Sequence, residues 1–485
     1  MKTHELQRLI KIENKIKQIA SEELGLSFPD IEFDCVPAEK MIEIMACGGP
    51  SQISHWSYGK NYEKIKTIYS EIDPNLPYEV VINSLPPRAY LLNKNTLAVH
   101  ALVIAHVYGH VHFFTKSKFF SKHRRDIIEL LSNASDRFSR YEKKYGIENV
   151  EPIIDAGLAL QQHVNPYDEE TEEQKRERVY EHHKKKMQPF SHEFSDLINS
   201  KDRDRTLDIE AYNSQLWLAL KNLVPVEPTD DILRFIIDNS KNLDDWEKDI
   251  LEILREEGMY YRPAIKTKTM NEGLACLVHQ KIMQRLFDLR LLTLEEHGQY
   301  AVSNSLAKAK SMFSINPYLV GSKMLEDIED RWNKGKFGKE WENCENITAK
   351  KNWNKDLGLG WKKVLDVCES YNDWLFMQDF LTTDLIEELE LFIYQQIETR
   401  DEIRLVRTEH TLEEIKQMIL MSYALSYTPK IEVIEGRKEL ILRHEYYGNN
   451  LDTKYALETI KHVTRLWGNK VLLHTRDGEA ELVLG

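Results

Sequence analysis

Two histidines stand four residues apart in a run of otherwise mostly apolar residues. The stretch "LAVHALVIAHVYGHVHFF", residues 97–114, contains His106 and His110. On a helix, residues i and i+4 lie on one face about 6 Å apart, so both rings can point at one ion. The apolar neighbours predict a buried helix, in which an imidazole without a partner costs roughly 1–3 kcal/mol. The two histidines therefore need a metal ion, a carboxylate, a backbone carbonyl or a water.

A second apolar segment carries a carboxylate with the same need. In "TKTMNEGLACLVHQKIM", residues 267–283, Glu272 opens an otherwise apolar helix and His279 follows seven residues later on the same face. Two imidazoles and one glutamate form a three-ligand metal site with an open position. We predict His106, His110 and Glu272 as ligands of a divalent metal, with zinc favoured and iron or manganese as alternatives. Core histidines satisfied by ordinary hydrogen bonds are the structural alternative.

The sequences of both segments resemble those of the gluzincin-type zincins. The first helix of these enzymes carries HExxH, and one branch of them carries NEGxA. This chain has "HVYGH" and "NEGLA", with Val107 where those enzymes have the glutamate that acts as general base. If the protein is a metal-dependent hydrolase, another residue must supply the base. The candidates are Glu151 and Asp155, four apart on a mainly apolar helix, together with Tyr108 and His279. For Glu151 and Asp155 the structural alternatives are a helix N-terminal charge and a salt bridge.

A third region has the composition of a pocket lining. In "GGPSQISHWSYGKNYEKI", residues 48–65, a glycine-rich loop is followed by His55, Trp56 and Tyr58. We predict these three side chains, together with Asn271 of the NEG segment, as substrate-binding residues. Ordinary packing of the aromatic residues is the alternative.

The elements that must position these residues are mostly helical. Residues 4–26 follow the period of one amphipathic helix, and residues 233–261 predict two more, the second capped by Asp244 or Asp245. The segment "PYEVVINS", residues 77–84, predicts a short buried strand. The predicted fold is therefore mainly α, with a zincin-like helical core around the candidate site.

Two segments depart from this pattern. Residues 168–188 are nearly all charged and predict a solvated helix or a mobile loop inserted into the core, where neighbouring lysines argue against metal binding by its two adjacent histidines. Residues 430–485 predict a compact ββαββ unit, a small α+β module suited to interaction or docking. We predict a helical core over residues 1–400 and a connection over 401–429.

Composition excludes several classes of protein. The chain has 485 residues, 42% of them apolar and 30% charged, and a formal net charge of −14, which argues against a general nucleic-acid binder. The histidines interrupt the longest apolar run, so we expect no membrane span, and the charged amino-terminal residues argue against a secretory signal. The five cysteines are scattered and odd in number, which favours a reducing compartment. We expect a cytoplasmic protein.

The chain resembles the SpoVR (stage V sporulation protein R) family over nearly its whole length. The matching stretches include "HWSYGKNYE", "LVIAHVYGHVHFF", "VEPIIDAGLALQ", "TKTMNEGLA", "NPYLVGSKMLEDIEDRWNKGKFGKEWE" and "HEYYGNNLDTKYALETI". Where the family commonly has FFKNN after the histidine helix, this chain has "FFTKSKFF". It also has Leu274 in place of a tryptophan and Val278 in place of an aromatic residue.

The resemblance implies a cytoplasmic protein needed for spore cortex formation or cell-envelope development, with a stress or developmental role. It also implies a PrkA-type serine kinase and a companion protein as partners. Two functions remain open: a metal-dependent hydrolase, and a regulatory scaffold in which the polar cluster is structural and the carboxy-terminal module docks a partner such as the kinase.

Overall fold

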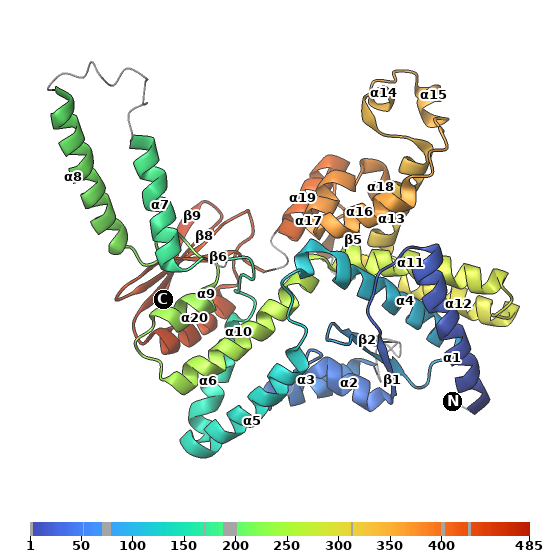
Figure 1. Ribbon diagram of the computed structural model, residues 1–485, viewed down its shortest axis with the longest axis horizontal. Helices are drawn as coiled ribbons and strands as arrows, with labels where there is room; N and C mark the ends of the chain where they lie inside the picture. The colour runs from blue at the N-terminus through green and yellow to red at the C-terminus, as the bar shows by residue number, and fades with distance from the viewer. Residues whose placement is uncertain are drawn as a thin grey trace. The chain divides into compact units, whose positions relative to one another are not determined.

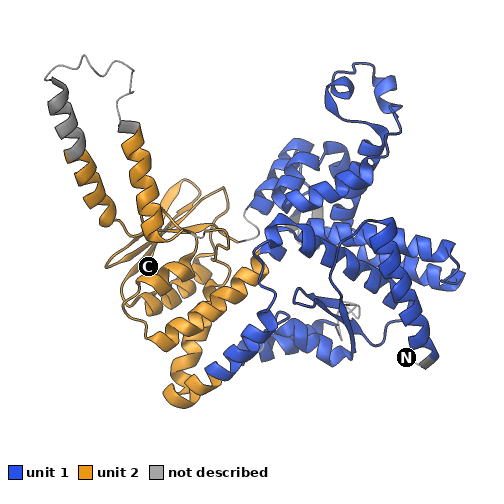
Figure 2. Cartoon of the chain, in the orientation of Figure 1, with its two compact units in different colours: residues 1–137, 263–427 blue, residues 138–262, 428–485 orange. Residues whose placement is uncertain are grey.

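The computed structural model describes residues 3–51, 53–69, 79–168, 170–187, 201–311, 314–398, 403–424 and 428–485 (Figure 1). The chain forms two compact units. Unit 1 comprises residues 1–137 and 263–427, and unit 2 comprises residues 138–262 and 428–485 (Figure 2). The prediction of a mainly α protein with a small carboxy-terminal sheet module is confirmed.

Unit 1 is mostly helical. Its amino-terminal part contains α1 (Thr3–Gln18), the π-helical turn η1 (Ile19–Glu23), β1 (Glu32–Val36), α2 (Ala38–Ala46), α3 (Trp56–Thr67), β2 (Glu79–Ile82), β3 (Arg88–Leu92), α4 (Leu97–Lys116) and η3 (Lys118–Phe120). Its second part contains α11 (Lys268–Asp288), α12 (Leu294–Ala307), α13 (Pro317–Lys334), α14 (Gly338–Glu342), α15 (Ile347–Lys351), α16 (Gly360–Ser370), α17 (Asp373–Phe380), α18 (Thr383–Glu388), β4 (Tyr394–Glu398), β5 (Ile403–Arg407) and α19 (Leu412–Ala424).

The core of unit 1 is built around α4, which packs against α1, α11 and α12, while α13 packs on the other side of α11 (Figure 1). Thr96 caps the start of α4, and Asn316 caps α13 with Pro317 in its first turn. A three-stranded sheet in the order β1-β3-β2 contacts α4, with β1 parallel and β2 antiparallel to β3. Sequence periodicity identified β2 but neither of the other two strands of this sheet.

Helix α4 is more continuous than its histidines suggested. It spans 20 residues and is long and apolar enough to cross a bilayer by length and composition, but 94% of its most apolar stretch lies buried inside the protein. A core helix satisfies the same test, and the packing of α4 accounts for its apolar character.

Unit 2 combines helices with the carboxy-terminal module. Its helices are α6 (Ile147–Leu160), α7 (Glu172–Met187), α8 (Lys201–Lys221) and α9 (Ile232–Asn239), while α5 (Ile127–Tyr145) and α10 (Asp245–Lys266) run through the unit boundaries. The module consists of β6 (Ile431–Gly436), β7 (Leu440–His444), α20 (Thr453–Trp467), β8 (Val471–Asp477) and β9 (Ala480–Leu484), in the predicted ββαββ order. The four strands form one sheet in chain order, with β7 and β8 parallel.

The division by packing differs from the division predicted along the chain. Residues 138–262, predicted as part of the core, pack with the carboxy-terminal module, since Phe235 of α9 stacks on Trp467 of α20. The predicted connection, residues 401–429, contains β5 and α19. Of the charged run, residues 172–187 form α7, which lies beside α8.

Candidate metal centre

Helices α4 and α11, which carry the predicted metal ligands, approach each other closely because glycines lie between them. A side chain at Gly109 would place its Cβ 2.6 Å from the backbone of Ala275. A Cβ at Gly273 would clash with the backbone of Gly321 on α13. The glycines of "HVYGH" and "NEGLA" therefore let α4, α11 and α13 pack backbone against backbone, which brings the polar side chains of the neighbouring turns together.

The start of α11 is fixed by a carboxylate from another helix. Asp373 of α17 accepts hydrogen bonds from the backbone N–H groups of Thr269 and Met270, at 2.8 and 2.9 Å. Burial raises the pKa of Asp373 to about 7, although these two donors oppose the shift. The first turn of the helix that carries Glu272 is thereby capped from outside.

Four side chains from three elements converge between these helices. Oε2 of Glu272 lies 3.4 Å from Nε2 of His106 and 3.5 Å from Nε2 of His110. Oε1 of Glu79, at the start of β2, lies 3.8 Å from Nε2 of His106. The imidazoles are 4% and 7% exposed, and the two carboxylates 15% and 16%, so solvent reaches the cluster from the carboxylate side. The three predicted ligands are thus brought together, and Glu79 joins them.

These separations fit the edges of a metal coordination shell better than hydrogen bonds. Charge-assisted N–H···O bonds measure about 2.7–2.9 Å. Ligand atoms at 2.0–2.2 Å from a tetrahedral ion are about 3.3–3.6 Å apart. The distances from Glu272 to His106 and His110 fall in the second range.

The outer nitrogen of each histidine is already occupied. Nδ1 of His110 lies 2.9 Å from Oδ1 of Asn271, a distance at which the ring nitrogen donates to the amide oxygen. Nδ1 of His106 lies 3.0 Å from Nδ1 of His279, and Nε2 of His279 lies 2.9 Å from Oδ1 of Asn304.

This chain of hydrogen bonds sets the tautomers. The oxygen of Asn304 can only accept, so Nε2 of His279 donates to it and Nδ1 of His279 accepts from His106. Nε2 of the neutral His110 then carries a lone pair directed at Glu272, whereas His106, whose pKa is raised, carries a proton on Nε2 as well and faces Oε2 of Glu272 at 3.4 Å. The lone pair of His110 and the carboxylate of Glu272 repel one another, and a cation between them would relieve this repulsion.

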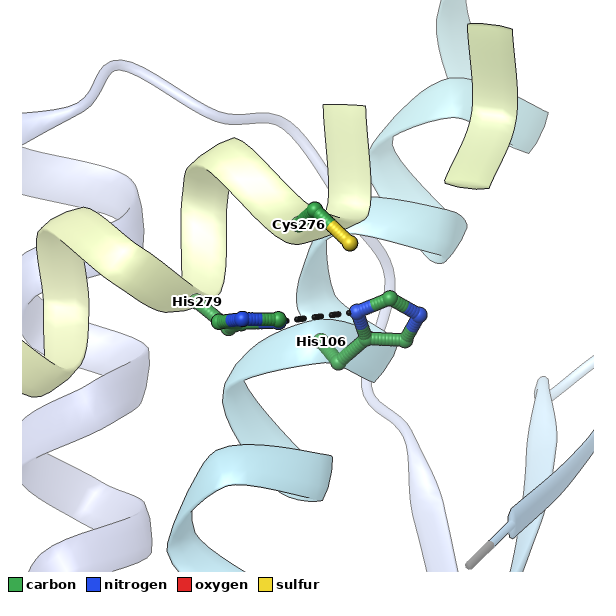
Figure 3. A group of neighbouring side chains, drawn as sticks. All are labelled: His106, Cys276 and His279. Carbon is green, nitrogen blue, oxygen red and sulfur yellow. Dashed lines mark hydrogen bonds between the residues drawn. The ribbon is translucent and has the colours of Figure 1, made fainter. Parts of the chain in front are cut away.

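Cys276 lies on the opposite side of His106 from the carboxylates. Figure 3 shows His106 of α4 facing Cys276 and His279 of α11, and one ligand atom of each lies within 4.8 Å of the others. These three residues could also hold an ion. However, the 3.0 Å between Nδ1 of His106 and Nδ1 of His279 is a hydrogen-bond length. We therefore infer that His279 orients the ring of His106.

The electrostatics separate the two ligand histidines. Burial lowers the pKa of His110 to about 4, despite the nearby Glu272, so this ring is neutral as a ligand must be. Burial opposes the charge on His106 too, but Cys276 and Glu272 raise its pKa well above the usual value. Burial would raise the pKa of Glu272, yet the histidines outweigh it and hold that pKa below its ordinary value. Burial also raises the pKa of Glu79.

Tyr318 of α13 completes the described surroundings. Its ring stacks 6.0 Å from the ring of His106. The neighbouring carboxylate of Glu272, burial and then Glu79 raise its pKa well above the usual value, so the hydroxyl keeps its proton.

The remaining predicted site residues lie elsewhere. Tyr108 is buried on another face of α4, where its hydroxyl donates to Oε1 of Glu13 and its ring packs edge-on against Phe28. Glu151 and Asp155 lie on α6 in unit 2, outside the unit that contains the histidines. No catalytic role for these three residues follows from the described geometry.

The predicted substrate-binding cluster is local to the start of α3. His55 caps this helix by accepting from the backbone N–H of Ser57, and Trp56 is 54% exposed. The hydroxyl of Tyr58 lies 3.2 Å from that of Ser51. Among the described contacts, none joins these side chains to the histidine cluster. Asn271 does belong to the cluster, but its described contact is with His110.

Comparison with known proteins identifies the family. The model for SpoVR like protein matches residues 3–428, and the model for the SpoVR-like C-terminal domain matches residues 429–478. The chain belongs to the SpoVR family. A relative in this comparison is the uncharacterized protein YcgB of Escherichia coli strain K12, 27% identical over 475 residues, which cover 93% of this chain and 89% of YcgB. No solved structure matches the chain.

Sequence reasoning missed Glu79 and Tyr318. Glu79 stands at the start of the predicted buried strand "EVVI", and a charged residue there was a signal that it faces a polar partner. Tyr318 follows an Asn-Pro helix start, which predicts a helix boundary but no neighbour of its side chain.

Proposed function

We propose that this SpoVR-family protein is a metal-dependent hydrolase that cleaves an amide bond at a zincin-like site, with zinc favoured over iron or manganese. The observation that supports it is the pair of Nε2 atoms at 3.4 and 3.5 Å from one oxygen of Glu272, each on a ring whose Nδ1 is already engaged. His106, His110 and Glu272 would hold the ion.

A divalent metal at this site would lower the pKa of its bound water and polarise the substrate carbonyl. Val107 is fully buried in the core and offers no base. Glu79 is the carboxylate beside the cluster that belongs to neither ligand helix, so we assign it the general-base role. Glu79 takes a proton from the attacking water. The hydroxyl adds to the carbonyl carbon, the carbon–nitrogen bond breaks, and the proton passes to the leaving nitrogen.

Elemental analysis of the purified full-length protein tests the metal. We expect one equivalent of a transition metal in the wild type and none in the His106→Ala/His110→Ala double variant. Circular dichroism must show that the double variant is folded. A wild type without metal after purification without chelators and reloading with zinc, iron or manganese overturns the proposal.

The Glu79→Gln variant tests the chemistry separately from metal binding. It should keep the metal and lose about 100-fold or more in the rate of hydrolysis of blocked dipeptides, because general-base catalysis contributes roughly 10²–10⁴-fold. A variant that keeps its full rate would assign the base elsewhere, whereas one that loses the metal would make Glu79 a fourth ligand.

Family membership supports the cellular part of the proposal. We propose that the protein acts in the cytoplasm in spore cortex formation or cell-envelope development, including under stress. The test is to replace the chromosomal copy by the His106→Ala/His110→Ala variant and to score envelope integrity. A phenotype equal to that of the deletion supports a role for the site, and a wild-type phenotype at equal protein level contradicts it.

The second candidate function is a regulatory scaffold that acts with a PrkA-type serine kinase and a companion protein. The carboxy-terminal module favours it, because α20 presents Tyr455 at 74% and Leu457 at 41% exposure. A Tyr455→Glu change in the full-length chain should then abolish co-purification with such a kinase while metal content stays unchanged. Unchanged co-purification, or none with the wild type, argues against the scaffold.

A further inference from the structure

A cavity of about 620 Å³ lies in unit 1 at the beginning of the two helices that flank the metal cluster. Its walls come from the starts of α11 and α13, the segment around β4, and α19. Most of the lining is apolar, and its main apolar members are Ile315, Leu391, Phe392, Ile393, Ile415 and Ile419. A volume of this size accommodates a large apolar side chain together with the backbone attached to it.

The cavity contains one cation at its edge. Lys268 is exposed and lines the cavity, and among the described residues its ammonium has no hydrogen-bond or ion-pair partner. The other charged lining residue, Glu390, is already paired with Lys310 at 2.7 Å. The cavity therefore offers a positive charge beside an apolar wall, with the carboxylates of Asp373 and Glu272 as counter-charges within the fold, and this combination suits an anionic group on an apolar body.

The two helices whose starts line the cavity, α11 and α13, also carry residues of the candidate metal centre. Lys268 precedes Glu272 by four residues on α11, so the two side chains lie on one face about 6 Å apart. On α13, the lining residue Pro317 is followed directly by Tyr318, whose ring stacks on His106.

We propose that this cavity binds the carboxy-terminal residue of a peptide, with Lys268 binding the free carboxylate and the apolar wall taking an apolar side chain. The inference rests on the proposed hydrolase function and makes the enzyme an exopeptidase. In a terminal residue, the carbonyl carbon of the preceding amide and the carboxylate carbon are three bonds apart, within about 4 Å. Lys268 and Glu272 stand one helical turn apart on α11, so a carboxylate bound by the ammonium and a carbonyl beside Glu272 would lie along the same face of this helix.

The reaction is a balanced hydrolysis. Water supplies a hydroxyl to the carbonyl carbon and a proton to the nitrogen of the last residue, and the carbon–nitrogen bond between them breaks. The products are a peptide shorter by one residue and a free apolar amino acid. No oxidant or further reactant is needed.

Calorimetric binding of three probes to the full-length metal-loaded protein tests the inference. The probes are N-acetyl-glycyl-phenylalanine, its carboxy-terminal amide, and N-acetyl-glycyl-glycine. We expect the acid to bind about tenfold more tightly than the amide, as a hydrogen-bonded charge interaction provides. We also expect it to bind more tightly than the glycine probe, because glycine leaves the apolar wall uncovered.

Two variants assign these preferences to residues. Lys268→Met should remove the preference of acid over amide, and Phe392→Ala should reduce the preference of phenylalanine over glycine. Lys281→Met is the matched control, since Lys281 lies on the same helix but is paired with Glu329 at 2.7 Å, and it should bind like the wild type. Melting temperatures verify that all three variants fold.

The outcomes separate this inference from the proposed function. Equal binding of acid and amide to the wild type, or an unchanged preference in Lys268→Met, overturns the cavity assignment even if the protein holds its metal. Inorganic phosphate that displaces the acid probe completely at equal concentration would show an anion site without peptide recognition, which also overturns it. A wild type that never holds metal overturns the hydrolase instead.

Discussion

A buried polar cluster in unit 1 and a buried ion pair in unit 2 are built differently. In unit 2, Asp231 and Arg255 are 3% and 9% exposed, and Nη2 of the arginine lies 2.6 Å from Oδ2 of the aspartate. The same carboxylate also accepts from the backbone N–H groups of Asn165 and Arg234. In unit 1, His106, His110 and Glu272 are similarly buried, but their polar atoms stay 3.4 and 3.5 Å apart.

The two clusters differ in whether their polar atoms meet at hydrogen-bond distance. A buried ion pair that serves the fold closes to hydrogen-bond distance and satisfies its acceptors from within the protein, because an open pair would leave its desolvation cost uncompensated. In the unit 1 cluster, the Nδ1 atoms of the two rings are engaged by His279 and Asn271 on the side away from Glu272. A cation held at the proposed metal site would lower the cost of burying these groups without direct pairing.

Removal of the metal should have the largest effect and should act on unit 1 alone. We expect a chelator to lower the melting temperature of the wild type by about 10 °C or more, since binding at 1,000 times Kd adds about 4 kcal/mol. The His106→Ala/His110→Ala variant should not respond to the chelator.

Scanning calorimetry with and without chelator measures this effect, and added zinc should reverse it. The chelator should lower the melting temperature of the wild type more than that of the double variant. If both shift equally, the ion acts elsewhere in the protein and the comparison of the two clusters fails.

Breaking the closed cluster should give the opposite pattern. Arg255→Met leaves the buried carboxylate of Asp231 without its cation and should cost about 3–5 kcal/mol in the free energy of unfolding. Metal content should stay at the wild-type value. Denaturant titration and elemental analysis of the same sample check both, and Arg234→Met, which affects a half-exposed pair with Asp238, is the control and should cost under about 1 kcal/mol.

The open cluster was predictable in part because burial has a cost that sequence reveals. His106, His110 and Glu272 are polar residues on helices that periodicity marks as buried, and each therefore needs a partner. The same periodicity argues against Tyr108, which stands two residues from each histidine, about 200° round the helix, and indeed lies on another face. A closer use of the helical period would have left Tyr108 out.

The rest of the site depends on tertiary packing that no local pattern contains. Glu79 comes from an edge strand, Tyr318 from α13 and Asn304 from α12, and only the packing of these elements against α4 and α11 makes them neighbours. Glu151 and Asp155 lie on α6 of unit 2, and their acid–base role stays a prediction. The fold class followed from periodicity and the order of the module, whereas the grouping of residues 138–262 with the module did not.

Widening the helix contact should damage the site and the fold together. Gly273→Ala places a Cβ against the backbone of Gly321, and neither backbone can yield as a side chain could. We expect a loss of about 1–3 kcal/mol in stability and weaker metal binding, because the ligand helices must separate. Gly298→Ala on α12 is the control, since a Cβ there meets nothing within 4 Å. Chemical denaturation and metal competition assays measure both quantities, and wild-type metal affinity in Gly273→Ala would show that the close contact is not what sets the ligand positions.

The smallest effect should come from the partner that holds His279. Asn304→Leu removes the acceptor for Nε2 of His279, which frees that ring to present either nitrogen to His106. Metal affinity should fall about 10–100-fold, as is usual for outer partners of ligand histidines.

Cobalt substituted for the native metal gives a readout that a purely structural role would not move, because its visible absorption changes when His106 binds in a different orientation. Asn304→Asp keeps the acceptor and should restore the wild-type spectrum. If Asn304→Leu leaves both affinity and spectrum unchanged, the cluster is open for a reason other than the hydrogen bonds behind it.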